Sequence, residues 1–176
     1  MTSGGIAQPQ DPRLSAEDPA RYGDTYLQAR SALQGHAQTL AALGLGREDV
    51  VYARAYLVAD GAKGGDFDLS GWDRAFTEFF ALGDGTQHRP TRTTLGISRL
   101  GRPELLIEIE LLAAYPDGKA APTTRALNPM LSPLTRPGSR IAQAVSVNGN
   151  APLYFTSGML ADPANPEAPA RDPAHM

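Results

Sequence analysis

The sequence predicts a single α+β domain, and three observations indicate this class. Apolar residues recur at helical spacing in two segments, β-branched and aromatic runs mark three strands, and the order is helix, strand, helix, strand, strand. A length of 176 residues suffices for one domain of ordinary size and is too short for two. Glycine and proline crowd residues 1–23, 116–138 and 162–176, so we expect loops there.

The first helix is indicated by apolar positions that recur at steps of three and four, namely Tyr26, Ala29, Leu33, Ala37 and Leu40. Asp24 is a suitable N-cap for it, and Gly44 or Gly46 a suitable end. The second helix is expected near residues 70–82. There an aromatic set falls on one helical face, namely Trp72, Phe76, Phe79 and Phe80.

The three strands of the main body are expected at residues 50–58, 93–99 and 105–114. In the last of these, isoleucines alternate with Glu108 and Glu110, so both carboxylates project from the same face. Two further strands, 142–148 and 153–156, are typical of a hairpin because Asn148-Gly149 lies where a tight turn would form.

Composition narrows the function classes. Hydrophobic residues make up 41% of the chain and charged residues 20%, with a net charge of −3. These values exclude a disordered acidic tail and a strongly basic nucleic-acid binder. No apolar run approaches the ~20 residues that span a bilayer, and the first residues lack the pattern of a secretory signal. We therefore expect a cytoplasmic protein that binds neither membrane nor nucleic acid.

Metal and thiol chemistry is not predicted. The absence of cysteine excludes disulfides, thiolate nucleophiles and cysteine-built zinc sites. His36, His88 and His175 show no ligand spacing, so we expect no metal site. The Gly44-Leu45-Gly46 sequence follows a helix rather than a strand, and so it does not form a dinucleotide fingerprint.

The end of the chain repeats its beginning. Residues 1–7 read MTSGGIA and residues 155–161 read FTSGMLA, and both copies continue into loops rich in proline and aspartate. Their separation is close to one domain length, which is too long for a solenoid repeat. The alternative interpretation is chance similarity between two short loop segments.

Three stretches between residues 23 and 114 resemble the RidA (YjgF/YER057c/UK114) family, which is known for deamination of 2-iminoacids and enamines and includes members labelled endoribonucleases. The first reads GDTYLQA at 23–29, then LG at 43–44 and DVV at 49–51. The second reads FTEFF at 76–80, then RPTRTTL at 89–95, and the third reads LIEIELLA at 106–113. Their order is that of the family.

The resemblance implies a chorismate-mutase-like, RidA-type fold, with a mixed sheet, two helices on one face, and assembly as a homotrimer with sites between subunits. Residues 1–115 form the main body and residues 116–137 a proline-rich linker. Residues 138–160 resemble the family's N-terminal hairpin, here placed after the body, and residues 161–176 form a tail. The chain is thus a circular permutant, a segment cut from two tandem copies of the domain, or a chain whose tail completes a neighbouring copy by strand exchange.

The resemblance also implies two catalytic residues. Arg92 matches the family arginine that binds the substrate carboxylate, which a planar guanidinium holds through two parallel hydrogen bonds. Glu108 matches the glutamate credited with positioning the attacking water. From spacing alone, Arg92 is interpreted as a solvated arginine at the start of a strand after Pro90. Glu108 and Glu110 are both interpreted as carboxylates on the solvent-exposed face of a strand.

Three further residues are expected to line the substrate site. Either Ser157 or Ser3 supplies the family's Thr-Ser-Gly serine, and we favour Ser157 because its strand is complete. The alternative interpretation is that this serine has only a structural role, as a turn residue before glycine. Two positions depart from the family: Ile141 replaces a common tyrosine, and Asp73 an asparagine. The loss of the tyrosine hydroxyl removes a polar contact from the pocket.

The function that follows is hydrolytic deamination of reactive 2-iminoacids or enamines to 2-ketoacids and ammonia. No cofactor is expected, since an imine carbon is already electrophilic. The alternative, favoured by Ile141, is a trimeric protein that binds small carboxylates without turnover. A weaker alternative is an endoribonuclease, suggested by the mild basic run of Arg89, Arg92, Arg99 and Arg102.

Overall fold

The computed structural model describes residues 1–82, 85, 88–116, 127–130 and 144–147. Two helices, α1 (Thr25–Ala42) and α2 (Leu69–Phe80), and four strands form the main body. The strands are β1 (Gly5–Ile6), β2 (Val50–Val58), β3 (Thr91–Ile97) and β4 (Ile107–Ala113). Short 3₁₀ turns lie at Pro19–Arg21, Arg47–Asp49 and Gly61–Lys63. The two helices and three of the strands confirm the predicted elements, with the stated ends shifted by at most two residues.

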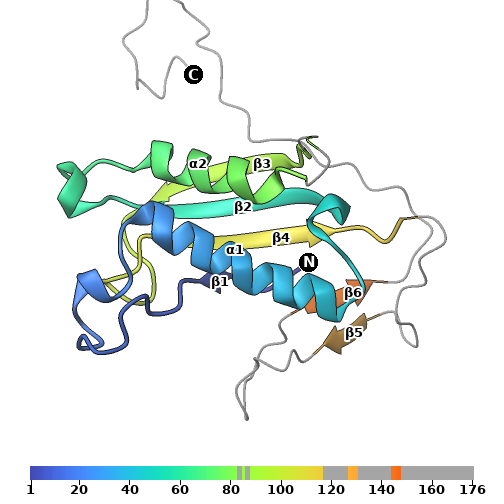
Figure 1. The fold of residues 1–176 in the computed structure, drawn as a ribbon, viewed down its shortest axis with the longest axis horizontal. Coiled ribbons are helices and arrows are strands. Elements are labelled where there is room, and N and C mark those ends of the chain that lie inside the picture. Colours follow the sequence, from blue (N-terminus) through green and yellow to red (C-terminus); the bar gives the residue numbers. More distant parts are fainter. Residues whose placement is uncertain (83–84, 86–87, 117–126, 131–143, 148–176) are drawn as a thin grey trace, which may run out of the picture.

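The four strands form one mixed sheet in the order β1-β4-β2-β3. Strands β2 and β3 run parallel, whereas β4 is antiparallel to both β2 and β1. Helices α1 and α2 lie side by side across the same face of this sheet (Figure 1). The predicted α+β class, with a mixed sheet and two helices on one face, is therefore confirmed.

Both helices begin at aspartate caps. The Asp24 carboxylate accepts a hydrogen bond from the backbone N–H of Leu27 at 2.9 Å, and Asp68 accepts one from Gly71 at 3.0 Å. After α1 the chain turns at Gly44, whose φ of 71° lies in the left-handed region that glycine adopts without strain. The predicted cap Asp24 and the predicted end at Gly44 are both confirmed.

The core lies between the helices and the sheet. Its largest fully buried side chains include Leu33 and Leu40 of α1, Trp72 and Phe80 of α2, and Ile109 of β4. Aromatic rings of α2 contact one another in series, with Trp72 and Phe76 centroids 5.2 Å apart and Phe76 and Phe80 centroids 4.6 Å apart. The helical spacing of these aromatics therefore reflects core packing.

The two faces of the sheet differ in chemistry. In β2 and β4 the residues facing the helices are small or aliphatic and fully buried, as Ala55 and Ile109 illustrate. The alternate positions carry Arg54, Tyr56, Glu108 and other polar or aromatic side chains on the opposite face, partly exposed. In the described part of the chain, no helix covers this second face.

Strand β1 was not predicted from the sequence. It pairs with β4 through Gly5 opposite Ile109 and Ile6 opposite Glu108. The buried His36 ring of α1 fixes this edge, because its Nε2–H donates to the carbonyl of Ile109 at 2.7 Å and the ring lies against Gly5. A two-residue strand that begins with glycine has neither the length nor the propensity to be recognised locally.

A second sheet consists of β5 (Leu127–Met130) and β6 (Ala144–Val147), which pair antiparallel. Strand β6 lies within the predicted strand 142–148, and β5 lies within the stretch expected to be a linker. The predicted hairpin partner 153–156 lies outside the described residues. The domain boundaries therefore stay a prediction.

Candidate functional site

Arg92 lies on β3 and faces the helices. Its register partner on β2 is the fully buried Ala53, so both project to the helix-covered side of the sheet. The guanidinium carbon of Arg92 stands 4.9 Å from the centre of the Phe76 ring and 5.6 Å from that of Trp72. Cation–π contact with two rings restricts the arginine, so its charged end is held at a defined place beside α2.

Asp73 completes this cluster. Its Oδ1 lies 2.6 Å from Nη1 of Arg92, and the side chains are 56% and 32% exposed respectively. The structure therefore brings together two of the predicted site residues, one from α2 and one from β3. The pair is open to an incoming small molecule, because neither partner is buried.

The floor beneath Arg92 is fixed by a hydrogen bond between α2 and β3. The indole Nε1–H of Trp72 donates to the Thr94 hydroxyl at 3.1 Å, and Thr94 lies on the same face of β3 as Arg92. Trp72 itself is fully buried. This bond ties the ring that supports the guanidinium to the strand that carries it.

Glu108 lies on the opposite face of the sheet. Its register partners are Tyr56 on β2 and Ile6 on β1, and its neighbours Ile107 and Ile109 point to the helix side. Its carboxylate packs directly against Gly4, so that a Cβ built at Gly4 would overlap Oε1. Gly4 thus forms one wall of the Glu108 environment.

Partial burial raises the pKa of Glu108, and repulsion by the Glu110 carboxylate raises it further. Glu110 lies 3.5 Å from Nη1 of Arg54, whose own pKa is held above its ordinary value by the hydroxyls of Tyr56 and Tyr52. A carboxyl group whose charged form is disfavoured takes up a proton more readily than an ordinary glutamate. Such a group suits proton transfer to and from a water molecule.

Arg92 and Glu108 do not meet within one chain. Arg92 shares the helix-facing side of the sheet with Ala53, whereas Glu108 shares the other side with Tyr56, and strand β2 lies between their strands. In a single chain the two groups therefore lie apart, with the sheet between them. This arrangement could not be read from the sequence, because each residue was placed by its own motif.

The remaining predicted site residues fall into two groups. Ser3 is described, and it precedes Gly4 in the wall beside Glu108. Ser157 and Ile141 lie outside the described residues, and their parts in the site stay predictions. The choice between Ser3 and Ser157 for the Thr-Ser-Gly serine therefore stays a prediction.

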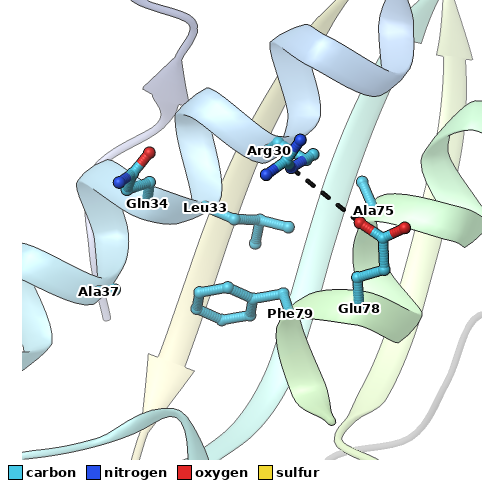
Figure 2. A pocket seen from close by; sticks show the side chains of 7 residues that line it. All are labelled: Arg30, Leu33, Gln34, Ala37, Ala75, Glu78 and Phe79. Atoms are coloured by element: carbon cyan, nitrogen blue, oxygen red, sulfur yellow. Dashed lines mark ion pairs between the residues drawn. The ribbon is translucent and has the colours of Figure 1, made fainter.

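A separate groove of about 270 Å³ runs between α1 and α2. Figure 2 shows Leu33 and Phe79 between the helices, with Arg30 and Glu78 forming an ion pair of 4.0 Å at the rim. None of the predicted site residues lines this groove. We therefore assign no part of the predicted chemistry to it.

The described residues lack two other features. No cluster of three or more histidine, aspartate or glutamate side chains there could hold a metal ion. Within the same residues, no helix combines the length and the apolar character needed to cross a bilayer.

Comparison with known proteins identifies the family. Residues 1–115 match the family model described as endoribonuclease L-PSP, and the chain belongs to this family. The predicted membership of the RidA (YjgF/YER057c/UK114) family is thereby confirmed. A search of curated proteins returned no match.

Solved structures with similar folds include members that carry the YjgF name. A protein of unknown function from Pseudomonas aeruginosa is 32% identical, with 63% of this chain and 70% of that chain covered and a TM-score of 0.49. The YjgF gene product from E. coli is 27% identical, with 63% and 76% covered and a TM-score of 0.46. A YjgF/YER057c/UK114 family member from Mycobacterium tuberculosis is 25% identical, with 64% and 75% covered and a TM-score of 0.44.

The sequence did not predict two features of the candidate site. Trp72 and Phe76 were placed on one helical face, but the contact of their rings with Arg92 was not predicted. Gly4 was not singled out, although the repeat that contains it was noticed. The repeat was the available signal, because a Thr-Ser-Gly segment that occurs twice marks a segment with a specific structural requirement.

Proposed function

We propose that the protein hydrolyses reactive 2-iminoacids or enamines to 2-ketoacids and ammonia. Arg92 binds the substrate carboxylate, and the carboxyl group of Glu108 positions the attacking water. Family membership and the ring-supported guanidinium of Arg92 support this assignment. The single observation that carries it is the partly buried Glu108, whose carboxylate packs against Gly4 and whose pKa is raised.

The reaction balances without a cofactor. The water oxygen adds to the C=N carbon while Glu108 accepts one of its protons, which gives a tetrahedral carbinolamine. Glu108 returns this proton to the nitrogen, and the C–N bond breaks as the C=O bond forms. The proton of the hydroxyl group passes through Glu108 to the departing ammonia, so the carboxylate is regenerated. Arg92 binds the carboxylate throughout, and this fixes the imine carbon next to the water.

The site is proposed to form between subunits of a homotrimer. Support comes from the opposite faces on which Arg92 and Glu108 lie, and from the sheet face that no helix of the described chain covers. If that face packs against the β3 edge of a second copy, Glu108 of one subunit lies near Arg92 of the other.

A coupled assay tests the activity. An amino-acid oxidase generates 2-iminoacids, and semicarbazide traps the portion that is not hydrolysed. We expect the wild type to suppress semicarbazone formation, and Arg92→Ala and Glu108→Gln each to abolish that suppression. If the wild type leaves semicarbazone formation unchanged across several side chains, the deaminase assignment is wrong.

Subunit mixing tests the composite site. Dissociating and reassembling equal amounts of Arg92→Ala and Glu108→Gln should restore activity at about one quarter of the sites, because random assembly pairs the two intact residues that often. A site built within one chain gives no recovery, since every chain then carries one defect. Sizing of the wild type by light scattering should give the mass of a trimer.

The second candidate function is binding of small carboxylates without turnover. Ile141 favours it, because it stands where many deaminases of the family have a tyrosine hydroxyl. A protein that binds ketoacids and fails the semicarbazide assay would have this function. The family description also names endoribonuclease activity, and salt-sensitive RNA binding would be the observation that favours it.

A further inference from the structure

The ion pair between Arg92 and Asp73 changes what the Arg92 site can bind. Asp73 stands in the second turn of α2, where its carboxylate pairs with Arg92 of β3. Its Oδ1 lies 2.6 Å from Nη1 of Arg92, and its side chain is 56% exposed. An arriving ligand therefore meets a positive and a negative group side by side rather than an isolated cation.

This pairing sets an electrostatic condition on the ligand. A simple carboxylate that binds the guanidinium is placed beside the carboxylate of Asp73, and two like charges at one arginine repel each other. A ligand with a cationic nitrogen next to its carboxylate avoids this cost. Its carboxylate faces Arg92 while its nitrogen faces Asp73, so two opposed ion pairs lie antiparallel.

We propose that Asp73 determines specificity at this site, by recognising the cationic nitrogen of zwitterionic ligands whose carboxylate is bound by Arg92. The proposal rests on the function assigned to Arg92 above. It names the substrate class as the protonated imine of a 2-iminoacid, which carries both charges. The 2-ketoacid product keeps the carboxylate and loses the nitrogen, so Asp73 favours the binding of substrate over that of product.

Binding of unreactive ligands tests this without turnover. Alanine and propionate share a carbon skeleton and differ by the ammonium group, so the ratio of their dissociation constants isolates its contribution. We would measure both by isothermal titration calorimetry on the wild type, Asp73→Asn and Glu78→Gln. Glu78 is the matched control, because it is an exposed carboxylate on the same helix that pairs with Arg74 at 3.0 Å.

The wild type should bind alanine more tightly than propionate. Asp73→Asn should reduce that preference about fivefold, the size expected for one solvent-exposed ion pair. Part of the change should be tighter propionate binding, because the asparagine removes the repulsion. Glu78→Gln should leave the ratio within about twofold of the wild-type value.

Other outcomes overturn the proposal. Asp73 does not recognise a cation if Asp73→Asn keeps the wild-type preference for alanine, or if Glu78→Gln changes that preference equally. The same conclusion follows if the wild type binds neither compound or prefers propionate. The semicarbazide assay separately decides the deaminase assignment. An active enzyme with an unchanged binding ratio in Asp73→Asn would retain the proposed function and lose this inference alone.

Discussion

Replacement of Gly4 by alanine is the most direct test of how the N-terminal segment supports Glu108. A Cβ at this position would overlap Oε1 of Glu108 and lie 2.7 Å from its Cδ and 3.0 Å from its Cγ. Carbon atoms approach to about 3.5–4.0 Å, so the carboxyl group must move by about 1 Å. The far end of a flexible side chain can make this movement, so the backbone stays in place.

The expected effect is on activity rather than on stability. A displacement of about 1 Å at a reacting group costs on the order of 100-fold in rate. Because Gly4 is exposed and only a side chain moves, the free energy of unfolding should change by less than about 1 kcal/mol. We would measure kcat/KM in the semicarbazide assay and the free energy of unfolding in urea.

Two controls make this result decisive. Gly101→Ala should leave both quantities unchanged, because a Cβ there meets no atom within 4 Å. In a Glu108→Gln background, Gly4→Ala should cause little further loss of activity, since the group it displaces is already absent. Gly4→Ala with wild-type activity, or with a loss of stability that matches its loss of activity, would refute the reasoning.

Two further predictions concern stability and pH. Burial lowers the pKa of His36 in the folded state, so below about pH 6.5 the unfolded chain binds more protons than the folded chain. The free energy of unfolding should therefore fall as the pH is lowered, by up to about 1.4 kcal/mol per pH unit. Urea titrations between about pH 7.5 and 5.5 test this, and His36→Gln with an unchanged slope would contradict it. Burial and Glu110 raise the pKa of Glu108, so its ionised form destabilises the fold at neutral pH. Glu108→Gln should therefore raise the free energy of unfolding, measured in urea at pH 7, by roughly 0.2–1 kcal/mol. This gain should disappear below about pH 4, where Glu108 is protonated in the wild type. A variant that is less stable than the wild type at pH 7 would contradict this prediction.

The helices and central strands could be predicted from the sequence because their signals are local. Apolar residues three and four apart mark α1, and alternation of isoleucine with glutamate marks β4. The same alternation placed Glu108 and Glu110 on the wetter face of their strand, which the structure confirms. Each signal lies within a single helix or strand, so it can be recognised without knowing which elements pack against it.

The arrangement of the site was decided by contacts between distant segments. Gly4 meets Glu108 because β1 pairs with β4, and Asp73 meets Arg92 because α2 packs across β3. No local pattern specifies such a pairing, since it depends on which apolar faces are buried together. The sequence by itself therefore determined the main helices and strands, and it supplied the candidate site residues. Only the tertiary structure placed Arg92 and Glu108 on opposite sides of one sheet, because the packing of both helices on a single face gives that sheet its two sides.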